Sequence, residues 1–88
     1  MKLVNIGSGN LISAERVVTV LTPESAPIKR IIQDAKEQKV LIDASMGRKT
    51  KTVIVTDSHH IILCYLSYEK LAARLSDYAV EFLEEDDE

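Results

Sequence analysis

The sequence predicts a single α+β domain: a small antiparallel β-sheet with one central helix and a C-terminal helix. Its 88 residues fit one domain and contain no internal repeat. Short runs rich in β-branched residues are separated by turn-forming residues, which is typical of short strands. Two longer segments, residues 25–38 and the segment from Tyr68, carry apolar residues at helical spacing.

The N-terminal quarter is expected to be extended. Residues 2–6 form a short strand that the turn-forming residues 7–10 stop, and residues 11–13 resume extended structure. Residues 16–21 form the next strand, which Pro23 ends. The two glycines at 7 and 9 lack the third glycine and the following helix of a dinucleotide-binding motif, so they indicate a turn.

Residues 25–38 are expected to form the central helix. Ser25 is the expected N-cap, and Pro27 stands in the first turn, where its missing N–H costs nothing. The apolar stripe at i, i+3, i+4 and i+7 consists of Ile28, Ile31, Ile32 and Ala35.

Three further strands are expected at residues 40–44, 51–57 and 61–66. Their short connections, with tips at 46–49 and 57–60, predict an antiparallel meander. Residues 61–66 are apolar on both faces, so this strand should be covered on both sides. The helix at 25–38 could cover one side, and another subunit could cover the other.

The C-terminal helix should start at Tyr68 and give way to an acidic tail. Its apolar stripe consists of Leu71, Leu75, Tyr78 and Phe82. Residues 81–88 hold six acids and no base, whereas residues 1–80 hold 8 acids and 11 bases. We therefore divide the chain into a domain at 1–80 and an acidic tail at 81–88, which either folds back on the basic surface as a competitor for its ligand or keeps the protein soluble.

Composition limits the classes of function and location. The single Cys64 has no partner for an intrachain disulfide, which fits a reducing compartment. The sequence shows no signal peptide and no apolar run near 18 residues, so the expected location is cytoplasmic, without a membrane partner. Because 45% of the residues are apolar, a domain this small should associate with other copies.

No catalytic, metal or cofactor site can be assembled from the sequence. His59 and His60 would point to opposite faces of a strand, and Cys64 is the only other soft ligand. No nucleophile stands beside a base. We therefore expect a protein that is not an enzyme, with no metal, no cofactor and no small-molecule substrate.

The bases at the first tip are the strongest candidates for a binding site. Arg48, Lys49 and Lys51 stand at or beside Gly47, where long cationic side chains should project into solvent. They indicate either a nucleic-acid contact or a merely solvated turn, and Asp43 or Asp57 could neutralise one of them.

Five sequence blocks resemble the RemA family (extracellular matrix regulatory protein A). They are N-I-G-x-G-N at 5–10, S-A-x-R at 13–16, PESAPIKR at 23–30, L-I-D-A at 41–44 and G-R-[RK]-T at 47–50. The resemblance extends from about Val4 to Leu75 and is much more specific than any of the short motifs.

The resemblance implies a transcriptional regulator that binds double-stranded DNA, controls biofilm-matrix genes and assembles into a ring-like homo-oligomer that bends DNA. Arg16, Arg48 and Lys49 match the family's DNA-binding bases. Pro27 and Arg30 match helix positions needed for activity, and we group Arg30 and Lys51 with the DNA-binding residues and Pro27 and Gly47 with the structural ones.

Two positions depart from the family pattern. Met46 replaces a common aromatic residue. Lys49 replaces a common arginine, and as a point charge it suits phosphate contact but not bidentate recognition. The alternative function is a structural assembly protein that oligomerises through the same apolar faces and binds a protein partner.

Overall fold

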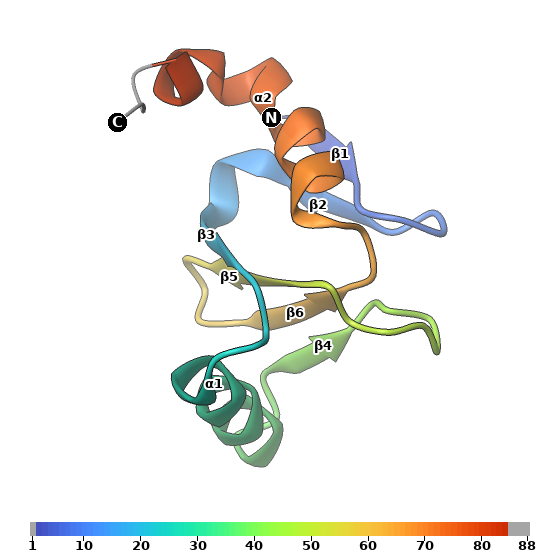
Figure 1. The fold of residues 1–88 in the computed structure, drawn as a ribbon, viewed down its shortest axis with the longest axis vertical. Helices are drawn as coiled ribbons and strands as arrows, with labels where there is room; N and C mark the ends of the chain where they lie inside the picture. Colours follow the sequence, from blue (N-terminus) through green and yellow to red (C-terminus); the bar gives the residue numbers. More distant parts are fainter. Residues whose placement is uncertain (1, 85–88) are drawn as a thin grey trace.

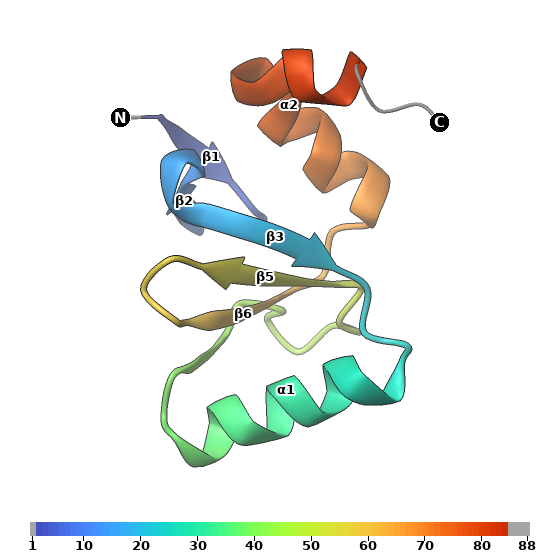
Figure 2. The same ribbon diagram turned by 90° about the vertical axis from the view of Figure 1, so that its left-hand side faces the viewer.

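A computed structural model describes residues 2–84, with the side chains of residues 2–76. The elements are β1 (Leu3–Asn5), β2 (Leu11–Ser13), the short 3₁₀ helix η1 (Ala14–Arg16), β3 (Val17–Leu21), α1 (Ala26–Glu37), β4 (Leu41–Asp43), β5 (Thr52–Thr56), β6 (Ile61–Cys64) and α2 (Tyr68–Glu84). A four-stranded sheet lies between α1 on one side and the β1–β2 hairpin with α2 on the other (Figures 1 and 2). The predicted α+β class, with a central and a C-terminal helix, is confirmed.

The order of strands in the main sheet corrects the predicted meander. The order is β3-β5-β6-β4, so β4 is not a neighbour of β5. β3 with β5 and β5 with β6 pair antiparallel as expected, but β4 pairs parallel with β6, with Leu41 opposite Ile61. The chain leaves α1 beside the start of β6, where the Ile61 N–H donates to the Val40 carbonyl at 3.0 Å. β4 therefore runs along β6 in the same direction, and β6 becomes an interior strand.

Both faces of β6 are covered by the same chain, which corrects the expectation that a second subunit covers one of them. Ile61 belongs to a cluster with Ala35 of α1. Ile62 and Cys64 belong to the opposite cluster, which includes Val4 of β1 and the fully buried Leu71 of α2. The alternation of side chains along one strand thus fills two cores, one on each side of the sheet.

The two helices begin as the sequence predicts. The Ser25 hydroxyl accepts a hydrogen bond from the Ile28 N–H at 3.4 Å, and Pro27 lies in the first turn of α1. α2 continues to Glu84, so residues 81–84 of the predicted acidic tail are helical. Residues 85–88, and the side chains of Tyr78 and Phe82, lie outside the described part. Neither α1 nor α2 over the described residues is long and apolar enough to cross a membrane.

Candidate nucleic-acid interface

Residues 44–51, here called the basic loop, connect β4 to β5 across the end of β6. Two backbone hydrogen bonds of 2.9 Å attach the loop to β6: the Ala44 N–H donates to the Leu63 carbonyl, and the Lys51 N–H donates to the Cys64 carbonyl. The loop is therefore a connection over an interior strand rather than the predicted hairpin tip. Anchoring at both ends limits its freedom and fixes where its side chains leave the surface.

A tight turn within the basic loop presents Arg48. The Arg48 N–H donates to the Ser45 carbonyl at 3.0 Å, and the two central residues, Met46 and Gly47, have φ of 56° and 80°. Such a turn favours glycine, which accounts for Gly47, while Met46 adopts a conformation uncommon for its type.

Asp43 stabilises the start of this turn, and among the described side chains it forms no ion pair with the bases of the loop. Its carboxylate accepts hydrogen bonds from the Ser45 hydroxyl and from the Ser45 N–H, the latter at 2.9 Å. These two bonds, the hydroxyl first, hold the pKa of Asp43 below its ordinary value, against a smaller opposing effect of burial.

Arg48 lies over the ring of Tyr65, with its guanidinium carbon 4.7 Å from the ring centroid. The Tyr65 hydroxyl is 3.0 Å from the Ser8 hydroxyl, and a Cβ on Gly7 would come within 2.7 Å of the ring. The β1–β2 turn therefore holds the ring, and the ring supports the guanidinium through a cation–π contact. The predicted turn at 7–10 is confirmed, and its first glycine is explained by the close approach of Tyr65.

Arg48 and Lys51 line a hollow of about 180 Å³ together with Lys70 from the first turn of α2. The other lining residues are Tyr65, Leu66 and Ser67, so no carboxylate among the described side chains lines it. Among the residues with described side chains, none of the three bases forms an ion pair. We call this site the Lys70 hollow.

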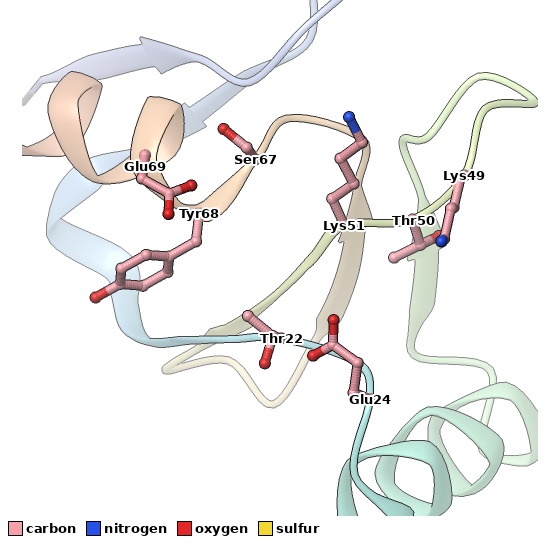
Figure 3. A pocket seen from close by; sticks show the side chains of 8 residues that line it. All are labelled: Thr22, Glu24, Lys49, Thr50, Lys51, Ser67, Tyr68 and Glu69. Carbon is pink, nitrogen blue, oxygen red and sulfur yellow. The ribbon is translucent and has the colours of Figure 1, made fainter.

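A second hollow, of about 360 Å³, shares Lys51 and Ser67 with the first and has mixed charge. Figure 3 shows Lys49 and Lys51 with Glu24, which precedes α1, and Glu69, which lies at the start of α2. Its remaining lining residues are Thr22, Thr50, Ser67 and Tyr68. Because two carboxylates accompany two lysines, this hollow is less suited to an anion than the Lys70 hollow.

Arg16 lies at the opposite end of the sheet from the basic loop. It ends η1 just before β3, and Val17 pairs with Thr56 at the finish of β5, whereas the basic loop leads into the start of β5. Its Nη1 atom is 3.3 Å from Asp57 Oδ1, and the side chains are 65% and 48% exposed. The structure does not bring Arg16 together with Arg48 and Lys49 within one chain.

Arg30 is exposed on α1, in a different layer from the basic loop. Its neighbour Lys29 does approach the loop, because Lys29 and Lys49 line a third hollow with Thr50. Sequence reasoning missed Tyr65, Lys70 and Lys29 as parts of this surface. In the sequence, only the positive charges of the two lysines indicate a possible role in binding. These charges do not show which lysines lie near the basic loop.

Cys64 and His60, which were considered for metal or redox chemistry, form ordinary hydrogen bonds within the fold. The buried Cys64 thiol donates to the Ile6 carbonyl at 3.3 Å, and His60 Nδ1 is 2.8 Å from the Ser58 hydroxyl. Within the described residues, no group of three or more His, Cys, Asp or Glu side chains could hold a metal ion.

Comparison with known proteins identifies one matching family and several relatives that share one general description. The family model described as RemA-like, "Extracellular matrix regulatory protein A-like", matches residues 3–75. A protein of Acetivibrio thermocellus is 56% identical over 88 residues, covering 100% of this chain and 95% of the relative. One of Alkaliphilus oremlandii is 59% identical over 76 residues, covering 86% and 82%. Each relative carries only the general description of a regulatory protein.

Proposed function

Because the chain belongs to the RemA-like family of regulatory proteins, we propose that it is a DNA-binding transcription regulator of the biofilm-matrix type, acting as a ring-like homo-oligomer and not as an enzyme. Its partners are double-stranded DNA and further copies of itself, in the cytoplasm. The basic loop carries the proposal, because Arg48, Lys49 and Lys51 are exposed and form no ion pair among the described side chains.

These basic side chains suit the DNA phosphate backbone better than the edges of the nucleobases. Lysine is a compact point charge, and phosphate contacts supply most of the affinity of such proteins without reading sequence. Sequence preference would then come from the cost of bending the DNA, which depends on its deformability. Arg30 is the weakest member of the predicted set, since it lies on another layer.

An oligomer would provide a continuous basic rim, which a single chain does not have. Arg16 and the basic loop lie at opposite ends of the sheet, so a continuous basic rim needs copies placed side by side. Exposed apolar side chains, including Val18 on β3 and Ile42 on β4, offer contact area to those copies. Repetition of a small basic site around a ring raises avidity without requiring any strong single contact.

The test measures binding of the full chain to two duplexes of unrelated sequence by fluorescence anisotropy over a series of salt concentrations. We expect Arg48→Ala and Lys49→Ala to weaken binding to both duplexes and to reduce the slope of log K against log salt by about 0.9 per lost phosphate contact. Lys36→Ala, on an exposed lysine of α1, is the matched control and should leave the slope unchanged.

The competing function is an assembly protein that binds a protein partner through the exposed apolar residues. Unchanged affinity and slope in both loop variants would contradict the DNA-binding proposal and favour this alternative. The native mass, measured by light scattering with and without duplex, tests the oligomer separately, and a monomer in both conditions would contradict it.

A further inference from the structure

We propose that the Lys70 hollow binds one phosphate group of the DNA backbone, with Lys70 as a ligand alongside Arg48 and Lys51. The inference rests on the proposed function and deepens it by assigning a phosphate to a particular place on the surface. It also adds a residue of α2, 19 positions beyond the basic loop, to the binding site.

The fold brings the three bases to one place from two separate segments. Lys51 ends the basic loop, and Lys70 lies in the first turn of α2. The buried hydroxyl of Thr52 donates to the Leu66 carbonyl at 3.2 Å, which ties the start of β5 to the segment that leads into α2. Lys51 and Lys70 are therefore brought to the same hollow.

The positive charge of the hollow favours binding of an anion. Three cations line it, and no carboxylate in the part of the chain with described side chains does, in contrast to the neighbouring hollow with Glu24 and Glu69. Like charges gathered around one hollow repel each other, and an anion between them removes that repulsion. A flexible lysine ammonium and a planar guanidinium can both donate to phosphate oxygens.

The hollow is also partly preorganised and is small. Tyr65 supports the Arg48 guanidinium, so less freedom is lost when that group binds an oxyanion. Its volume of about 180 Å³ is below the roughly 300–1,000 Å³ of typical small-molecule pockets. It therefore fits a single phosphate group rather than an organic effector.

The α2 backbone adds little, because its start is already capped. The Ser67 hydroxyl accepts from the Lys70 N–H at 3.2 Å. The side-chain charges, and above all that of Lys70, are thus the part of the site to test.

The experiment compares Lys70→Gln with Lys36→Gln in the full chain. Both variants remove one positive charge from an exposed lysine, but only Lys70 lines the hollow. We expect the salt slope for duplex binding to fall by about 0.9 per contacting protomer in Lys70→Gln. If the variant and the wild type bind equally at 1 M salt, this change in slope makes binding at 0.1 M salt about eightfold weaker for each lost contact. Lys36→Gln should keep the wild-type slope.

The outcomes separate this inference from the proposed function. If the wild type binds duplex and Arg48→Ala weakens it, but Lys70→Gln keeps the wild-type slope, the site is overturned and the function stands. If the wild type does not bind duplex at all, the proposed function fails, and the backbone as the source of the phosphate fails with it.

A second arm tests phosphate binding directly and distinguishes a backbone phosphate from a free one. Sodium pyrophosphate and a short duplex are titrated separately into ¹⁵N-labelled protein at constant ionic strength, and the amide signals of Lys51, Ser67 and Lys70 are followed. Shifts with duplex that Lys70→Gln abolishes support the site. Saturable shifts with pyrophosphate alone would place a free phosphate there instead and overturn the backbone assignment, and no shift with either would overturn the site.

Discussion

Replacing Gly7 by alanine should destabilise the fold more than the same change at Gly9, because only Gly7 packs against Tyr65. Both glycines have positive φ, 117° at Gly7 and 81° at Gly9, so alanine is strained at either position. The strain costs roughly 1–2 kcal/mol for an L-residue in the left-handed region. At Gly9 nothing lies within 4 Å of the new Cβ, so the strain is the whole effect.

At Gly7 a steric effect adds to the strain. The new Cβ would lie 2.7 Å from Tyr65 Cζ and 2.8 Å from its hydroxyl oxygen, so the ring has to move. Overpacking of this kind typically costs about 1–3 kcal/mol. We therefore expect the free energy of unfolding to fall by about 1–3 kcal/mol more in Gly7→Ala than in Gly9→Ala.

Urea denaturation at one fixed protomer concentration measures both values, and the fixed concentration matters because assembly would shift apparent stability. A double-mutant cycle then tests the cause. In a Tyr65→Ala background the ring is gone, so the difference between the two glycine variants should shrink. Equal effects in the wild-type background, or an undiminished difference without the ring, would refute the reasoning.

The same pair of variants reports on the binding surface. A displaced Tyr65 ring no longer holds Arg48 in place, and ordering a free side chain on binding costs about 0.5–1.5 kcal/mol. Under the proposed function, Gly7→Ala should therefore bind duplex roughly two- to twelvefold more weakly per contacting protomer, while Gly9→Ala should not.

Two further predictions concern the other charged groups. Arg16→Ala should change the free energy of unfolding by less than about 1 kcal/mol, because the Arg16–Asp57 pair is exposed, yet it should weaken duplex binding. Asp57→Asn releases the Arg16 guanidinium and should strengthen duplex binding. Anisotropy titrations in which Arg16→Ala binds more tightly and Asp57→Asn more weakly than the wild type would contradict the role of Arg16. The pKa of Asp43 is lowered in the folded state, so its contribution to stability is present above the unfolded pKa and is lost as the pH falls through the folded pKa. Ser45→Ala removes the largest cause of that shift, so the pKa of Asp43, followed by NMR, should rise toward its ordinary value, and an unchanged pKa would show that the backbone bond alone sustains it.

Local structure was largely predictable from the sequence because the signals are local. The β-branched runs gave β3 and β5, the Ser25 cap and the apolar stripe gave α1, and the residues at 7–10 gave the first turn. Each of these depends on residues within a few positions of one another. The close contact of Gly7 with Tyr65 was not predictable, because these residues are 58 positions apart.

Strand order was not predictable, because alternation shows which face a residue takes but not which strand lies beside it. Consecutive strands with short connections favoured a meander. The apolar residues on both sides of β6 showed that both of its faces are covered, and this is consistent with either order of the strands beside it. The same limit applies to the binding site, since nothing in the sequence places Lys70 beside Lys51.

The structure also changes the physical reason for expecting an oligomer. The apolar content of the chain suggested that a second copy covers one face of β6, but α1 on one side and the β1–β2 hairpin with α2 on the other already do so. The apolar surface that remains exposed includes Val18 and Ile42, which lie on β3 and β4, the two edge strands of the main sheet. Contacts made there would join copies through opposite edges, and such head-to-tail contacts generate a ring when the rotation between copies closes. The case for assembly therefore depends on exposed apolar residues such as these, because both faces of β6 are covered within one protomer.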